Sequence, residues 1–131
     1  MTFYRAMAVF GWLTGLGLSL LSLSAAWAEE GRVVVFSAEW CANCRDVLPI
    51  IQDSAQELGI PVFVIDVDRQ DAARQAKNFG LAIPTTEPPQ AYWVADEHQL
   101  LLFDGRTYDP SVSGAKLKKQ VTQKLNQRSA L

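Results

Sequence analysis

The sequence predicts an α/β domain with a mixed central sheet flanked by helices, and three observations support this class. Two apolar, β-branched runs at 32–36 and 61–66 enclose a segment with helical spacing of its apolar residues. Two further strand-like runs, at 91–94 and 99–103, are close enough to form a hairpin. The chain has 131 residues, 49 % of them hydrophobic, which is typical of one folded domain and not of a disordered chain.

Residues 1–28 have the features of an export signal. Arg5 precedes the apolar run Ala6–Leu23, and Ala26-Trp-Ala28 forms an A-x-A cleavage site before Glu29. The run is also long enough for an uncleaved membrane anchor, since about 20 apolar residues cross a bilayer. In both cases the folded domain, 29–131, is expected outside the cytoplasm, in a periplasm or a thylakoid lumen.

The first two strands are predicted to form a parallel pair. Arg32–Phe36 is apolar after its first residue, which indicates a strand buried on both faces. Apolar residues then recur at three- and four-residue steps up to Leu58, which predicts a helix that ends at Gly59. Pro61–Asp66 predicts a second buried strand. Strands joined through a helix are expected to run parallel.

A short helix and a proline-rich loop follow. Asp71 is placed to cap this helix with its side chain, and Gly80 is placed to end it. The loop, 83–89, contains three prolines. It leads into the predicted hairpin.

The C-terminal part is predicted to be a hairpin and one amphipathic helix. His98 is expected in the hairpin loop as a solvated turn residue. Leu117, Val121 and Leu125 recur at four-residue steps and predict the buried face of the last helix. Its lysines are expected on the solvated face.

The candidate chemistry lies at Cys41-Ala-Asn-Cys44, directly after the first strand and at the start of the first helix. Unpaired N–H groups at a helix N-terminus favour a thiolate, the form of cysteine that attacks disulfides. Cys41, the more N-terminal, is expected to be the exposed nucleophile, and Cys44, on the apolar face, the resolving thiol. A C-x-x-C motif at a strand-to-helix junction indicates dithiol–disulfide chemistry.

Other kinds of site fit the sequence less well. The chain has two cysteines and one histidine, fewer than the usual four ligands of a structural zinc site. A disulfide across three residues closes too short a loop to stabilise the fold much. The formal net charge of −2 also argues against a protein that binds nucleic-acid phosphates. We therefore expect no metal and no cofactor besides the redox-active Cys41–Cys44 pair.

Several residues give the sequence a resemblance to the thioredoxin superfamily over most of 32–127. Ala38-Glu-Trp-Cys41 matches the A-E-W-C of that family, Pro49 matches its helix proline, and Phe79-Gly80 resembles its aromatic–glycine pair. The resemblance implies a thioredoxin fold, trimmed because the sequence starts too late for the first strand and helix. It also implies a cis-proline opposite the cysteines, beside which an extended substrate pairs.

Two prolines compete for that position. Pro84 lies in an I-P-T sequence that resembles the family motif, but the strand after it would then contain Pro88 and Pro89, which cannot donate ladder hydrogen bonds. Pro89 leads directly into the third strand, and Gly105 follows at the family spacing. We therefore expect a cis Pro88–Pro89 bond, and a substrate-binding surface formed by Trp40, Pro88 and Pro89.

The sequence also departs from the superfamily pattern at several positions. The family holds a buried Asp and a Lys where this chain has Val35 and Val64, and the dipeptide between the cysteines is Ala-Asn. Both changes put in doubt the family's usual proton transfer at the resolving cysteine and its usual redox potential.

The expected function is that of an exported thiol–disulfide oxidoreductase that reduces client protein disulfides through Cys41 and Cys44. The resemblance suggests apocytochromes c as clients and a membrane thiol transporter as electron donor. A disulfide oxidase or isomerase remains an alternative in the same class. A non-enzymatic assembly factor or a copper-handling binding module is the alternative in another class.

Overall fold

The computed structural model describes residues 31–131, and the predicted export segment, 1–28, lies outside them. The strands and helices are, in chain order, β1 Arg32–Ser37, α1 Ala42–Glu57, β2 Val62–Asp66, α2 Ala72–Asn78, β3 Gln90–Ala95, β4 His98–Asp104 and α3 Gly114–Asn126. Short 3₁₀ turns occupy Gly105–Thr107 and Gln127–Ala130. Every strand and helix expected in this part of the chain is present. Within residues 31–131, no helix is both long enough and apolar enough to span a bilayer.

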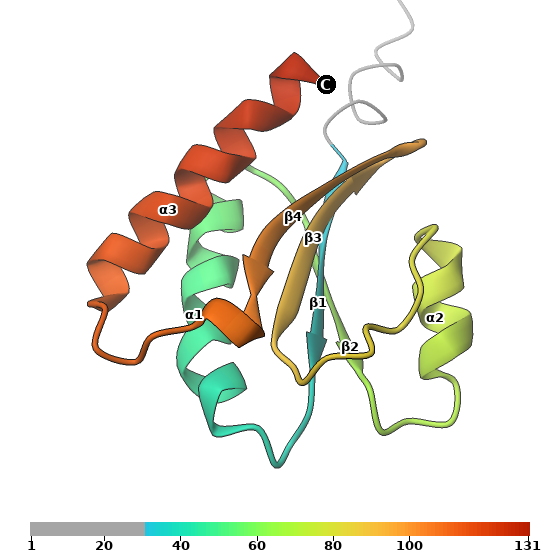
Figure 1. Ribbon diagram of the computed structural model, residues 1–131. Coiled ribbons are helices and arrows are strands. Elements are labelled where there is room, and N and C mark those ends of the chain that lie inside the picture. The colour runs from blue at the N-terminus through green and yellow to red at the C-terminus, as the bar shows by residue number, and fades with distance from the viewer. Residues whose placement is uncertain (1–30) are drawn as a thin grey trace, which may run out of the picture.

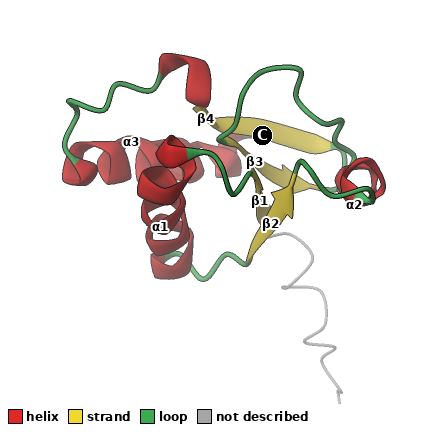
Figure 2. Cartoon of the chain, turned by 90° about the horizontal axis from the view of Figure 1, so that it is seen from below, coloured by secondary structure: helices red, strands yellow, loops and turns green. Residues whose placement is uncertain are grey.

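The four strands form one mixed sheet in the order β2-β1-β3-β4. β1 and β2 are parallel, whereas β3 is antiparallel to both β1 and β4. Helices α1 and α3 cover one face of this sheet and α2 covers the other (Figure 1), and the view from below shows the same layers (Figure 2). The predicted combination of a βαβ unit and a hairpin is confirmed.

Strand β1 lies at the centre of the core. Val33 and Val35 belong to the apolar cluster under α1 and α3, and Val34 and Phe36 belong to the cluster under α2. All four side chains are fully buried, as the uninterrupted apolar run predicts. The first of these clusters also holds Leu117, Val121 and Leu125, so α3 is fixed by the face that its periodicity predicted.

The prediction of a second fully buried strand is wrong for β2. Phe63 is 44 % exposed and Val64 43 % exposed, and only Ile65 is buried. The reason is the position of β2 at the edge of the four-stranded sheet. The short helix α2 covers the face of Phe63 only in part, and Val64, on the opposite face, borders an open pocket beside α1. An apolar run alone does not distinguish a central strand from an edge strand.

Two local predictions also differ from the structure. Asp71 occupies the N-cap position of α2, but its carboxylate makes no capping bond and instead accepts hydrogen bonds from Arg69 Nε and Gln75 Nε2. His98 is the exposed first residue of β4 and not part of the hairpin turn. In contrast, α1 is followed by Gly59 at φ +69°, as expected for a helix-ending glycine.

Candidate active site

Cys41 is the N-cap residue of α1, four residues after the end of β1. Its sulfur accepts a hydrogen bond of 3.1 Å from the backbone N–H of Cys44. The sulfur therefore takes the place that a serine or aspartate oxygen commonly has at the start of a helix. Cys41 and Cys44 are joined by a disulfide bond. When the pair is reduced, the same N–H group is placed to stabilise a thiolate on Cys41.

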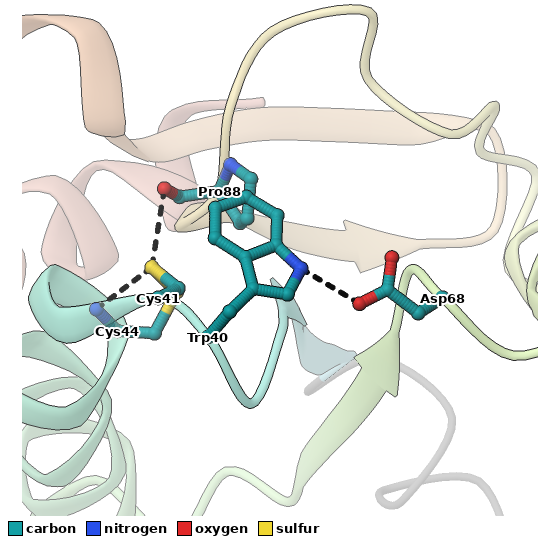
Figure 3. The surroundings of a disulfide bond; sticks show 5 residues. All are labelled: Trp40, Cys41, Cys44, Asp68 and Pro88. Atoms are coloured by element: carbon teal, nitrogen blue, oxygen red, sulfur yellow. Dashed lines mark hydrogen bonds between the residues drawn. A yellow bond between two sulfur atoms is a disulfide. The ribbon is translucent and has the colours of Figure 1, made fainter.

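The expected exposure of Cys41 is wrong, because both cysteines are buried. Cys41 is 5 % exposed and Cys44 2 % exposed, and they form a small cluster with Ala38. The carbonyl oxygen of Pro88 lies 3.4 Å from the Cys41 sulfur and covers it (Figure 3). A difference in reactivity between the two sulfurs must therefore come from their local electrostatics more than from their accessibility.

The loop opposite the cysteines contains the predicted cis peptide bond. Pro88–Pro89 is cis, and it is the only cis bond between residues 31 and 131, so the assignment to Pro89 over Pro84 is confirmed. Pro88 presents its carbonyl to the sulfur, whereas Pro89 is fully buried. A Cβ atom on Gly105 would lie 2.6 Å from the Pro89 carbonyl oxygen, so only glycine allows this loop to pack so closely.

A hydrogen-bond network that we did not predict holds this loop against the sheet. The Gln90 side chain is 3 % exposed, and its Nε2 donates to Thr86 Oγ1 and to Asp104 Oδ1, each at 2.8 Å. Arg106 donates to the same Asp104 carboxylate from its side chain and from its backbone N–H. These bonds hold the pKa of Asp104 well below its usual range. In the sequence, the one indication of this network was a polar residue, Gln90, at the start of an otherwise apolar strand.

Trp40 lies beside the sulfurs on the surface of the protein. Its side chain is 59 % exposed, and its indole Nε1–H donates a 2.7 Å hydrogen bond to Asp68 Oδ2 (Figure 3). The ring is thus held in one orientation while most of it remains open to solvent. It forms an apolar surface next to Cys41.

The charged groups near the cysteines are few. Glu39 and Arg45 are exposed, and together with Asp66 they border an open pocket that Cys44 also lines. His98 pairs with Ala95 at the opposite end of β3 from Gln90, so it is remote from the sulfurs. At the positions where the superfamily holds a buried Asp and a Lys, Val35 is fully buried and Val64 pairs with it across the strands.

A disulfide at the junction between a central strand and a helix, facing a cis-proline loop, defines the class of dithiol–disulfide exchange proteins. The comparisons agree with this class. The sequence matches the family model described as Thioredoxin over residues 23–127, and the chain belongs to the thioredoxin family.

Individual thioredoxins show the extent of the similarity. The chain is 27 % identical to thioredoxin of Bacillus subtilis over 106 residues, which cover 80 % of this chain and 88 % of that protein. It is 35 % identical to thioredoxin H4 of Arabidopsis thaliana over 60 residues, 44 % of this chain and 50 % of that one. Among solved structures, Fasciola hepatica thioredoxin aligns with a TM-score of 0.47 at 26 % identity, over 72 % of this chain and 83 % of that one.

Proposed function

We propose that the protein is an exported thiol–disulfide oxidoreductase that reduces disulfides of client proteins. The observation that carries this proposal is the position of Cys41, which caps α1, faces the Pro88 carbonyl and forms a disulfide with Cys44. In the reduced protein, the Cys41 thiolate attacks a client disulfide and one client thiolate leaves. Cys44 then attacks the Cys41 sulfur of the mixed disulfide, so that the second client thiolate leaves and the Cys41–Cys44 bond forms.

Of the three residues expected to form the client-binding surface, Trp40 and Pro88 are proposed to contact the client and Pro89 to position Pro88. The Pro88 carbonyl is a backbone acceptor beside the reacting sulfur, and an extended client segment carries the N–H donors that match it. The Trp40 ring, next to Cys41 in the sequence, provides an exposed apolar contact. Pro89 is buried, so its part is to hold Pro88 in place and not to touch the client.

The surroundings of Cys41 favour the reducing direction. One backbone N–H group stabilises a thiolate at this position, but the Pro88 carbonyl oxygen, 3.4 Å away, opposes it. Strong oxidants depend on a strongly stabilised thiolate, because that lowers the free energy of their reduced form. We therefore expect a reduction potential more negative than about −180 mV, the value typical of protein disulfide isomerase.

A reductase outside the cytoplasm needs a source of electrons. A membrane thiol transporter is the proposed donor, and apocytochromes c are the proposed clients, since haem attachment requires reduced cysteines. Both follow from the predicted export of residues 29–131. Neither is needed for the exchange chemistry itself.

Two measurements test the proposal. The domain should accelerate the reduction of insulin by dithiothreitol, seen as faster precipitation, and the Cys41→Ser variant should not. Equilibration of the disulfide with glutathione and then dithiothreitol buffers gives its potential. A potential clearly above −180 mV would favour an oxidase or isomerase instead. Absence of insulin reduction would favour a binding module, such as an assembly factor or a copper-handling protein.

A further inference from the structure

The resolving step requires Cys44 to lose a proton, because the thiolate and not the thiol attacks a disulfide. Cys44 is only 2 % exposed, and burial disfavours the charged thiolate. Its own backbone N–H group is already used by the Cys41 sulfur. The proton therefore needs an acceptor that can reach a buried sulfur.

An open pocket of about 480 Å³ adjoins Cys44. It lies between the first turns of α1, the turn after β1 and the edge strand β2, and its volume is sufficient for several water molecules. Trp40, Cys41 and Pro88 do not line it. The pocket is thus a route from solvent to Cys44 that is separate from the surface proposed to bind the client.

Two carboxylates border this pocket, and their settings differ. Asp66 ends β2, where it pairs with Ser37 of β1. Along β2 its side chain lies on the same face as that of Val62, which packs against the core under α1, so Asp66 projects toward α1. Glu39 is exposed on the turn before the helix.

The carboxylate of Asp66 is held in a defined orientation. It is half-buried, and one of its oxygens, Oδ1, accepts a 2.9 Å hydrogen bond from the backbone N–H of Asp68. Within residues 31–131 no other hydrogen bond to this carboxylate is formed, so the second oxygen is available to a water molecule in the pocket. This combination of fixed orientation and available oxygen distinguishes Asp66 from Glu39.

We propose that Asp66 accepts the proton of Cys44 through water in this pocket when the mixed disulfide is resolved. The Cys44 thiol passes its proton to the carboxylate, and its sulfur bonds to the sulfur of Cys41 with release of the client thiolate. Two electrons thereby pass from the Cys41–Cys44 dithiol to the client disulfide. The proton then returns from Asp66 to the released thiolate or to water. This role depends on the proposed exchange function.

If Asp66 acted only through its negative charge, its removal would change the rate of the resolving step in the opposite direction to the loss of a proton acceptor. The charged groups around the pocket are Arg45 on α1, Glu39 on the turn and Asp66 on β2, with Asp68 and Arg69 on the loop after β2. A negative carboxylate that acts only by its field raises the pKa of a nearby thiol. Its removal would then speed the resolving step at neutral pH, whereas removal of a proton acceptor slows it.

The test isolates the resolving step in a preformed adduct. Reduced protein is mixed with 5,5′-dithiobis(2-nitrobenzoate) to place thionitrobenzoate on Cys41, and release of the coloured thiolate by Cys44 is followed in a stopped-flow instrument. For Asp66→Asn, which still offers an oxygen to the Asp68 N–H, we expect release about tenfold slower at pH 7. The deficit should shrink as the pH rises above the ordinary thiol pKa of about 8.5, because hydroxide can then take the proton in place of the carboxylate.

Glu39→Gln is the matched control, since it removes the other carboxylate of the pocket, and it should release at the wild-type rate. Asp66→Glu keeps a carboxylate and should recover part of the lost rate. An unchanged or faster rate for Asp66→Asn, or an equal loss in Glu39→Gln, overturns the role of Asp66. Failure of the wild-type adduct to release any thiolate would instead overturn the exchange function on which that role depends.

Discussion

At the scale of single residues, the sulfur of Cys41 both caps a helix and carries the reactive electron pair. The N–H of Cys44 that satisfies the helix start also stabilises the sulfur as an anion, so the fold and the chemistry use the same hydrogen bond. Cys44 has no such donor of its own within the motif. The two cysteines are therefore chemically unequal although both are buried.

This inequality predicts a difference in alkylation. In the reduced protein near neutral pH, Cys41 should react with iodoacetamide about tenfold faster than Cys44, a ratio that corresponds to one unit of thiol pKa. Mass spectrometry of partly alkylated protein measures the ratio. Cys44→Ser should also accumulate mixed disulfides with clients, and Cys41→Ser should trap few. Faster labelling of Cys44 would reverse the assignment of nucleophile and resolving thiol.

The close packing at Gly105 leads us to predict that a larger residue there would displace the loop that faces the sulfurs. In Gly105→Ala the new Cβ would lie 2.6 Å from the Pro89 carbonyl oxygen, so the loop has to move. We expect a loss of roughly 1–3 kcal/mol in the free energy of unfolding, as for other overpacked sites, together with slower insulin reduction. Denaturant unfolding gives the first value.

Gly114→Ala is the control for this substitution. At Gly114 a Cβ would meet only the Ile50 side chain, at an ordinary contact distance of 3.4 Å. Its free energy of unfolding should change little. Equal losses in the two variants would show that close packing against Pro89 is not the cause.

At the scale of elements, the active site is built where three segments meet. The first turn of α1 supplies the cysteines, the loop before β3 supplies Pro88, and the end of β4 supports that loop through Asp104 and Gly105. Besides the packing of Pro89, the bonds of Gln90 with Thr86 and Asp104 hold this loop in position. The support from these bonds is electrostatic and therefore sensitive to pH.

The surroundings of Asp104 lead us to predict how the free energy of unfolding changes in acid. Its pKa in the folded protein lies below the usual value because of hydrogen bonds from Arg106 and Gln90. A lowered folded pKa adds stability above the unfolded value of about 3.9 and loses it as the pH falls toward the folded value. In Asp104→Asn, the free energy of unfolding should therefore fall less steeply between about pH 4 and pH 2 than in the wild type.

Urea unfolding at a series of pH values measures this slope. Asp46→Asn removes an exposed carboxylate of α1 and is the control, which should keep the wild-type slope. Identical slopes for Asp104→Asn and the wild type would contradict the role of Asp104 in supporting the loop.

At the scale of the whole molecule, the sheet is covered unequally. Helices α1 and α3 pack together on one face, joined at the surface by an ion pair between Glu57 and Lys118, and the seven-residue helix α2 lies on the other (Figure 1). On the face of α2, this leaves Phe63 of β2 largely exposed. On the face of α1, Val64 is also largely exposed and lines the pocket through which Cys44 is reached.

The N-terminal segment makes a prediction about the mature chain. Ala26 and Ala28 occupy the small-residue positions that signal peptidase recognises, so the exported protein should begin at Glu29. N-terminal sequencing of protein purified from the native envelope tests this. Recovery of residues 1–28 on a membrane-bound product would show that the segment is retained as an anchor.

Much of the fold and the central pair of the site could be predicted from the sequence, because the signals for them are local. Apolar runs, helical periodicity and capping residues predicted the strands and helices, and the C-x-x-C at the start of a helix indicated its chemistry. The choice of Pro89 over Pro84 also depended on a local rule, since proline cannot donate within a strand ladder. These features depend on neighbours only a few residues apart.

Only the tertiary structure decided which groups surround the cysteines. The burial of Cys41 under the Pro88 carbonyl joins residues 47 positions apart, and the bond between Gln90 and Asp104 spans 14. The edge position of β2, which exposes Val64 and places Asp66 in the lining of the pocket that Cys44 also lines, follows from strand order and not from the apolar run. Local sequence patterns determine which segments form strands and helices, whereas the contacts of a reacting sulfur depend on how distant elements pack.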